Sequence, residues 1–130
     1  MKKILIVDDE KNVRISLSIG LTREGYDVDV AGNALEALMK MKERLYDFML
    51  TDVKMPETNG IELANQVTKF FPYVRIILMS AYDFKDFEEK YTAVSEYPKL
   101  FKPFEMGEMT DTLNLLDEGY KRRNIRDATS

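Results

Sequence analysis

Short runs of aliphatic and β-branched residues alternate along this chain with longer segments whose apolar residues recur at helical spacing. Each run is too short for a core helix and is typical of a strand buried on both faces. Five runs are predicted to be strands: Lys3–Val7, Tyr26–Val30, Asp47–Thr51, Val74–Met79 and Lys99–Phe101. Alternating strands and helices are typical of a parallel sheet covered on both faces. We therefore expect one three-layer α/β/α domain with five parallel strands and five helices.

Apolar stripes at a spacing of about 3.6 residues locate helices between these strands. The stripes are Ala34, Leu38, Met41 and Leu45, then Phe84, Phe87, Tyr91 and Val94, and last Met109, Leu113, Leu116 and Tyr120. Each stripe is expected to pack in the core. Residues 121–130 lose the apolar pattern and are predicted to be a helix end and flexible tail. The domain is therefore expected to span residues 1–120, with no effector domain after it.

A further helix is predicted over about residues 11–24. Its core side carries Val13, Leu17 and Leu21, whereas Ile15 and Ile19 lie roughly opposite and are expected to be exposed. Single exposed apolar residues are common on protein surfaces, so exposure alone does not mark a binding site.

Two residue types are missing from the chain, and each absence limits its chemistry. Without cysteine there are no disulfides or thiolate sites, and without histidine there is no Ser-His-Asp triad. Any metal site must use oxygen ligands, which favours hard cations such as Mg²⁺, Mn²⁺ or Ca²⁺. The net charge of −4 argues against nucleic-acid binding, and no apolar run suits a membrane span or signal peptide. A cytoplasmic location with no DNA or membrane partner is expected.

Three acidic residues, Asp8, Asp9 and Glu10, follow the apolar run of the first predicted strand. Open α/β sheets form their binding sites at the C-terminal ends of strands. Adjacent carboxylates repel each other, so a cation or a hydrogen-bond donor is expected beside them. The alternative is a solvated turn that starts the next helix, with an aspartate as its N-cap. This segment alone leaves both interpretations open.

Polar residues also follow the third, fourth and fifth predicted strands. Parallel strands all end at the same edge of a sheet. We therefore expect one crevice that contains Asp8, Asp9, Asp52, Ser80 and Lys102. It is improbable that chance alone places three carboxylates, a hydroxyl and an ammonium group at one edge of the sheet.

This set of groups suits phosphoryl transfer. Three carboxylates need a divalent cation, which neutralises charge and can clamp the oxygens of a phosphoryl group. Ser80 and Lys102 supply donors for the remaining oxygens. A carboxylate can itself be the nucleophile and form an acyl phosphate. Asp52 is the best candidate because it is the lone acid at its strand end, whereas the Asp8 and Asp9 pair suits metal.

The chain resembles a response-regulator receiver domain, the CheY-like family of two-component signalling. The resemblance rests on ILIVDDE (4–10), DVKMPETNG (52–60), MSAY (79–82) and LFKPF (100–104), and it covers about residues 2–120. It implies a flavodoxin-like fold with strand order 2-1-3-4-5. It further implies a phosphoprotein that receives its phosphoryl group from a histidine kinase or histidine phosphotransfer protein and acts on a downstream protein target. Such a domain is a phosphoacceptor with self-phosphorylation and autodephosphorylation, not an enzyme in the ordinary sense.

The resemblance also implies roles for the cation ligands. Asp52 would be the phosphoacceptor and a metal ligand, and Asp9 a direct Mg²⁺ ligand. Asp8 would act mainly through water, and the main-chain carbonyl of Lys54 would be a further ligand. Mn²⁺ can substitute for Mg²⁺ at such a site.

Four other positions take roles from the same resemblance. Ser80 and Lys102 would contact the phosphoryl oxygens, and the Lys102-Pro103 bond is a candidate cis peptide. Lys54 and Tyr82 lie two positions after the acceptor and the serine, where receivers control the approach of water to the phosphoaspartate. A long cation and a large aromatic there predict a long-lived phosphoryl group, suited to a phosphorelay.

The match departs from the family where most receivers carry an aromatic switch residue coupled to the Ser/Thr. Here the position is Lys99, with Tyr97 and Phe101 on the same strand parity. The usual conformational switch is therefore in doubt, whereas the phosphorylation chemistry is not. The domain is expected to be a monomer or a weak dimer through the fourth helix, fifth strand and fifth helix.

Three other classes of protein fit less well. A receiver-fold binding module that is never phosphorylated would usually lose one of the acids or the lysine. A Mg²⁺-dependent phosphatase of the haloacid dehalogenase class would carry a D-x-D arrangement, which Asp8-Asp9-Glu10 lacks. A nucleotide-binding domain would need a glycine-rich phosphate loop after the first strand.

Overall fold

The computed structural model describes residues 1–57, 59–81 and 97–129, and for residues 119–129 it describes the backbone alone. Tyr82 and the helical stripe from Phe84 to Val94 lie outside the described residues. The described part of the chain contains four helices, and the predicted helix with the stripe from Phe84 to Val94 falls outside it.

One sheet of five parallel strands forms the centre of the domain, in the order β2-β1-β3-β4-β5. The strands are β1 (Lys3–Val7), β2 (Asp27–Ala31), β3 (Phe48–Asp52), β4 (Arg75–Ser80) and β5 (Lys99–Phe101). This order confirms the flavodoxin-like prediction.

Three strands begin and end one residue later than the sequence predicts. The predicted ranges 26–30, 47–51 and 74–79 correspond to 27–31, 48–52 and 75–80 in the structure. The shift follows from the pairing register, in which Asp52 lies beside Met79 and Ser80 lies beside Phe101. These two polar residues therefore form the last rungs of the sheet instead of the turns that follow it.

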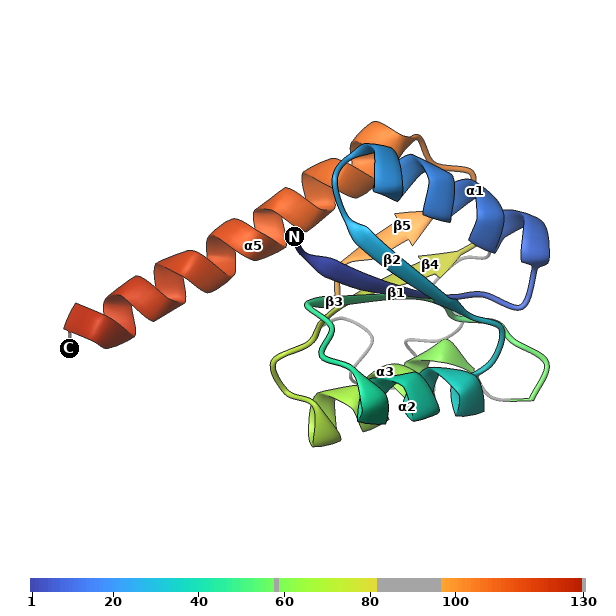
Figure 1. Cartoon of the computed structure of the whole chain (residues 1–130), viewed down its shortest axis with the longest axis horizontal. Coiled ribbons are helices and arrows are strands. Elements are labelled where there is room, and N and C mark those ends of the chain that lie inside the picture. The colour runs from blue at the N-terminus through green and yellow to red at the C-terminus, as the bar shows by residue number, and fades with distance from the viewer. Residues whose placement is uncertain (58, 82–96, 130) are drawn as a thin grey trace.

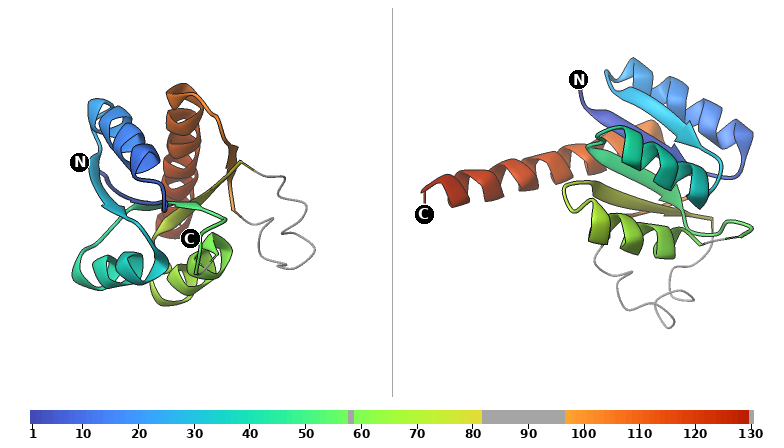
Figure 2. Two further views of the ribbon diagram at one scale, coloured as in Figure 1. Left: turned by 90° about the vertical axis from the view of Figure 1, so that its right-hand side faces the viewer. Right: turned by 60° about the horizontal axis from the view of Figure 1, so that its bottom comes forward.

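Within the described residues, two helices cover each face of the sheet. Helices α1 (Lys11–Arg23) and α5 (Met106–Thr129) lie on one face, and α2 (Ala34–Glu43) and α3 (Gly60–Phe70) lie on the other (Figures 1 and 2). The strands supply both cores because alternate side chains point to opposite faces. In β1, Ile4 and Ile6 pack towards α1 and α5, whereas Leu5 and Val7 pack towards α2 and α3.

Helix α1 carries its apolar residues as predicted. Leu17 and Leu21 are buried and Val13 packs at the edge of the same core. Ile15 and Ile19 are 47% and 50% exposed.

The core stripe of α2 differs from the prediction. Ala34, Ala37 and Met41 are the buried residues of the helix, whereas Leu38 is only partly buried. Leu45 is 72% exposed because the helix ends at Glu43, so the predicted stripe cannot continue to residue 45. The small Ala37 side chain lets the helix lie close to the sheet.

Helix α5 is longer than the sequence predicts. It packs through Met109 and Leu113, which are buried, and then continues to Thr129 through the segment predicted to be a helix end and flexible tail. Residues 121–129 contain neither Gly nor Pro to end a helix, and this last part extends beyond the body of the domain (Figure 1). None of the helices in the described part of the chain is long and apolar enough to cross a membrane.

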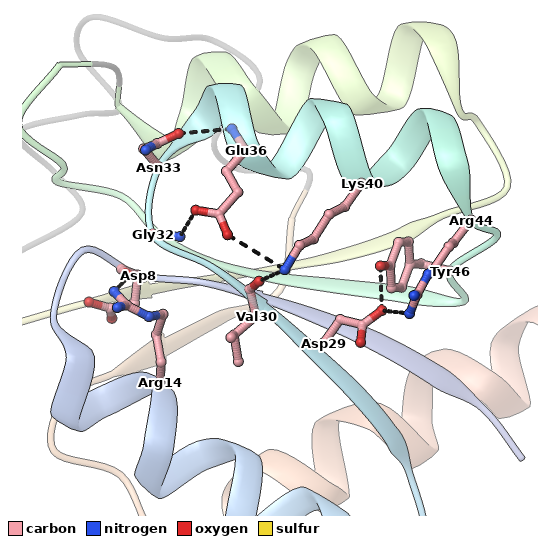
Figure 3. Close-up of polar contacts among 10 residues, drawn as sticks. All are labelled: Asp8, Arg14, Asp29, Val30, Gly32, Asn33, Glu36, Lys40, Arg44 and Tyr46. Carbon is pink, nitrogen blue, oxygen red and sulfur yellow. Dashed lines mark hydrogen bonds and ion pairs between the residues drawn. The ribbon is translucent and has the colours of Figure 1, made fainter.

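Polar side chains attach the outer strand β2 to the neighbouring α2 and the loop after it (Figure 3). Asp29 Oδ2 accepts hydrogen bonds from the Tyr46 hydroxyl at 2.6 Å and from Arg44 Nη1 at 2.9 Å. Lys40 Nζ donates to the carbonyl oxygen of Val30 and pairs with Glu36. These contacts hold the sheet edge close to the helical layer.

Candidate functional site

The polar residues predicted at the strand ends gather at the C-terminal edge of the sheet. Carboxylate oxygens of Asp8, Asp9 and Asp52 all lie within 4.8 Å of one another. Lys102, which follows β5, contacts two of these acids. The parallel sheet thus brings together residues that are up to 94 positions apart in the sequence.

Asp8 is fully buried and its carboxylate is held from two directions. Oδ1 accepts a hydrogen bond from the backbone N–H of Glu10 at 2.9 Å, and Oδ2 accepts one from Lys102 Nζ at 2.7 Å. The N-cap of α1 is Glu10, without a side-chain capping bond. The alternative of a solvated turn with an aspartate N-cap is therefore wrong for Asp8, whereas Asp9 is exposed.

The Lys102 ammonium lies between two carboxylates. It is 2.7 Å from Asp8 Oδ2 and 3.4 Å from Asp52 Oδ2. Burial alone would lower the pKa of Lys102, but the hydrogen bonds and negative charges of Asp8 and Asp52 outweigh it and raise the pKa. Lys102 is therefore a fixed positive charge at neutral pH.

Asp52 is 7% exposed and forms the last residue of β3. Burial raises the pKa of its carboxyl group, and the negative charge of Asp8 adds to this effect. The positive charge of Lys102 and a hydrogen bond with the backbone of Lys54 offset the rise only in part. Added positive charge beside Asp52 would favour its ionised form.

The backbone of Asp52 is packed against the start of α3. The Gly60 N–H donates to the carbonyl of Val53 at 2.7 Å, and a Cβ at position 60 would lie 1.9 Å from the Asp52 carbonyl oxygen. Real side chains never come so close, so only glycine fits here. The only signal for this contact in the sequence is the place of Gly60 directly after Asn59, the N-cap of α3.

An open cavity of about 620 Å³ lies over these groups. It is lined by acids, two lysines and apolar residues, namely Asp9, Glu10, Val13, Asp52, Lys54, Met55, Pro56, Ala81 and Lys102. Ser80 is fully buried at the end of β4, and its carbonyl accepts a hydrogen bond from the Lys102 N–H at 2.8 Å. Its neighbour Ala81, not Ser80, is among the lining residues. The cavity is large enough for a phosphoryl group and part of the molecule that carries it.

A second, more apolar cavity of about 420 Å³ adjoins the first. It lies between α1 and the segment after β5, and its lining includes Val13, Leu17, Pro103 and Phe104. The Lys102-Pro103 peptide bond is cis, as predicted. Val13 and Lys102 line both cavities, so the two form one continuous surface.

The position of the expected switch aromatic has different contacts here. Lys99 Nζ donates to the carbonyl of Tyr97 at 3.0 Å. The Tyr97 hydroxyl contacts Thr68 and Asn65 of α3, each at 3.0 Å, and Phe101 is 57% exposed. Tyr97, which precedes β5, is thus anchored to α3, and Phe101 at the end of β5 is the more accessible of the two aromatics.

Sequence comparisons identify close relatives of this chain. Residues 4–114 match the family model described as response regulator receiver domain. Sporulation initiation phosphotransferase F of Bacillus subtilis (strain 168) is 33% identical over 112 residues, which cover 86% of this chain and 90% of that protein. Transcriptional regulatory protein ZraR of Klebsiella oxytoca is 32% identical over 111 residues, which cover 85% of this chain. The chain spans only 25% of that longer relative.

Solved structures of similar sequence have the same fold. The response regulator protein TrrA from Thermotoga maritima, solved in complex with Mg(2+)-BeF, is 34% identical with a TM-score of 0.80. The match covers 89% of this chain and 99% of that chain. TrrA in complex with the histidine kinase ThkA gives a TM-score of 0.78 at the same identity, over 89% of this chain and 98% of that chain.

Proposed function

This chain belongs to the response regulator receiver domain family, and on that premise we propose that it accepts a phosphoryl group on Asp52 from a phosphohistidine. The observation that supports this proposal most directly is the gathering of Asp8, Asp9, Asp52 and Lys102 beside one open cavity. The receiver is a signalling phosphoacceptor, not a classical enzyme.

In the proposed step, a carboxylate oxygen of Asp52 attacks the phosphorus atom in line with the phosphorus–nitrogen bond. The new oxygen–phosphorus bond forms as the phosphorus–nitrogen bond breaks, and the histidine nitrogen keeps the electron pair and takes up a proton from water. The chain needs no general base because an ionised carboxylate is already a nucleophile. Lys102 is close enough to Asp52 to donate to a phosphoryl oxygen there, and we assign the Ser80 hydroxyl to another.

A magnesium ion fits the acidic cluster by both chemistry and charge. The three carboxylates lie within 4.8 Å of one another, and Mg²⁺ prefers oxygen ligands. Asp9 and Asp52, with the main-chain carbonyl of Lys54, would hold the ion, and Asp8 would act mainly through water. When bound, the ion neutralises negative charge and orients the phosphoryl oxygens. Mn²⁺, with the same ligand preference, is expected to substitute.

The proposed partners are proteins that carry a phosphohistidine. TrrA, which resembles this chain in sequence and fold, has been solved with the histidine kinase ThkA. The resemblance to sporulation initiation phosphotransferase F favours a relay, in which the phosphoryl group passes on to a second histidine protein. A downstream protein target, a cytoplasmic location and a monomer or weak dimer stay predictions.

A small phosphodonor such as acetyl phosphate with Mg²⁺, followed by intact mass measurement, tests the proposal. We expect a mass gain of one phosphoryl group that is absent in Asp52→Asn and is lost on mild base treatment, as an acyl phosphate requires. The same substitution should stabilise the metal-free protein by about 1 kcal/mol, because it removes one of three repelling carboxylates. A receiver-fold binding module, the alternative, would gain no mass.

A further inference from the structure

Arg14 reaches from α1 to the main chain at the end of β1. Its Nη1 donates a hydrogen bond to the carbonyl oxygen of Asp8 at 2.7 Å (Figure 3). On the other side of the residue, the Asp8 N–H donates to the carbonyl of Ala31 at 3.1 Å. With Glu10 and Lys102 on the carboxylate, every polar group of Asp8 has a partner.

Gly32 provides the space in which the guanidinium group lies. A Cβ at this position would be 3.4 Å from Arg14 Nη1 and 3.7 Å from Arg14 Cζ. The backbone N–H of Gly32 is held by Glu36 Oε2 at 3.1 Å, so the turn between β2 and α2 cannot easily move away. A branched side chain at position 32 would therefore press on Arg14.

The hydrogen bond from Arg14 fixes more than Asp8 itself. A peptide group is planar, so holding the Asp8 carbonyl also holds the N–H and Cα of Asp9 in one orientation. That orientation sets the direction in which the Asp9 side chain leaves the chain towards the cavity.

We propose that Arg14 is a positioning residue of the cation site. It acts through the Asp8–Asp9 peptide, and Gly32 is the partner that gives it room. This inference rests on the proposed function, because it assigns Mg²⁺ to the cluster of Asp8, Asp9 and Asp52.

The sign of the effect separates positioning from simple electrostatics. Arg14 carries a positive charge near three carboxylates, so its removal would by charge alone strengthen the binding of a cation. Loss of a residue that orients metal ligands weakens binding, commonly by tenfold or more. We expect Arg14→Ala to weaken Mg²⁺ binding about tenfold and Arg14→Lys to recover part of the loss.

The measurement is a Mg²⁺ titration of the metal-free protein, followed by amide NMR shifts near Asp52. The matched control is Arg23→Ala, which removes an exposed arginine from the last turn of the same helix. At saturating Mg²⁺, acetyl phosphate should phosphorylate Arg14→Ala at a rate within twofold of the wild-type rate, because the weakened site is then filled. A general loss of structure would instead lower the rate at every Mg²⁺ concentration.

The Gly32 contact gives a second, independent test. Gly32→Val should weaken Mg²⁺ binding in the wild-type background and have little further effect in Arg14→Ala, because the two changes disturb one contact. Gly32→Ala, whose Cβ makes an ordinary contact at 3.4 Å, is the control and should bind nearly as the wild type does.

Unchanged or tighter Mg²⁺ binding in Arg14→Ala would overturn the positioning role. If Asp9→Ala abolishes binding in the same titration, the proposed cation site stands and only the role of Arg14 fails. If the wild-type protein binds no Mg²⁺, both the proposed site and the inference fail together.

Discussion

The ammonium group of Lys102 lies 0.7 Å closer to Asp8 (2.7 Å) than to Asp52 (3.4 Å). The fully buried Asp8 thus has the closer contact with this ammonium group, and the charge of Asp52 is less well compensated for its own burial. A buried carboxylate without full compensation favours a new positive charge beside it. The pairing therefore leaves the proposed acceptor as the carboxylate that gains most from a bound cation.

Substitutions of the two neighbouring acids should affect Mg²⁺ differently. Asp9→Ala should abolish binding because it removes a direct ligand from the exposed side of the cluster. Asp8→Ala should weaken Mg²⁺ binding less. It also removes one of the two carboxylates that contact Lys102, so that the contact with Asp52 is left. The chain has no tryptophan, so NMR shifts near Asp52 are the better readout. Equal Mg²⁺ affinity in Asp9→Ala and wild type would contradict the ligand assignment.

Gly60→Ala should destabilise the protein more than the addition of a single methyl group would suggest. A Cβ at this position would lie 1.9 Å from the Asp52 carbonyl oxygen, so the end of β3 or the start of α3 must move. We expect a loss of about 1–3 kcal/mol in the free energy of unfolding and slower phosphorylation of Asp52. Urea denaturation and acetyl phosphate labelling measure the two effects.

Gly107→Ala is the matched control for Gly60→Ala. Nothing lies within 4 Å of a Cβ at position 107, which is in the first turn of α5. Alanine favours helix over glycine by up to about 1 kcal/mol, so this variant should be as stable as the wild type or more so. Equal losses in both variants would show that the contact with Asp52 is not the cause.

The surface formed by α1 and the segment after β5 should matter for protein donors alone. Val13→Ala and Phe104→Ala should slow phosphoryl transfer from a histidine protein but leave labelling by acetyl phosphate unchanged. Both residues line the apolar cavity that adjoins the acidic one. Ile15→Ala, on the opposite side of α1, is the control. Equal slowing with both donors would mean that the substitutions act on the acidic site or on the fold.

The lifetime of the phosphoaspartate should depend on Lys54. This residue is exposed and lines the cavity over Asp52, so its side chain can cover a phosphoryl group there. Lys54→Asn should speed hydrolysis about tenfold, which corresponds to about 1.4 kcal/mol of barrier. Tyr82→Glu is expected to act in the same direction. The rate at which the phosphoryl group is lost is measured by intact mass over time. If neither substitution changes this rate, shielding by these side chains is wrong.

The Asp29 cluster predicts a pH-dependent contribution to stability. Burial alone would raise the pKa of Asp29, but the hydrogen bond from Tyr46 and the charge of Arg44 outweigh it and lower the pKa. A carboxyl group with a lower pKa in the folded state stabilises that state above its unfolded pKa, near 4, and the contribution disappears as the pH falls through the folded pKa. Asp29→Asn should therefore be less stable than the wild type at pH 7, and the difference should shrink as the pH falls to 3. A difference that is the same at both pH values in urea denaturation would contradict this account.

The sequence predicted the fold well because its strongest signals are repeated along the chain. Buried strands alternate with helical segments along the chain, and such a sheet must be covered by helices on both faces. The ends of the strands were harder to locate. Asp and Ser are common in turns, so the predicted strands end before Asp52 and Ser80. In the structure these residues pair with Met79 and Phe101 and lie inside the sheet.

Contacts between side chains and backbone were the least predictable part of the site. Strand order alone placed Asp8, Asp52 and Lys102 at one edge, but it could not say which acid the lysine would contact more closely. The close approach of Gly60 to Asp52 and the reach of Arg14 to the Asp8 carbonyl depend on how α3 and α1 dock on the sheet. Nothing in the spacing of these residues carries that information.

The contact of Lys40 with Val30 has a consequence for association between molecules. In β2 the Asp27 N–H and the Ala31 carbonyl face β1, so the Val30 carbonyl points to the open side of this edge strand. An unpaired strand edge can recruit a strand from another chain, and a lysine bound there occupies an acceptor which that strand would need. The lysine thereby discourages edge-to-edge aggregation of the sheet while it leaves the strand ends, where the acids lie, open.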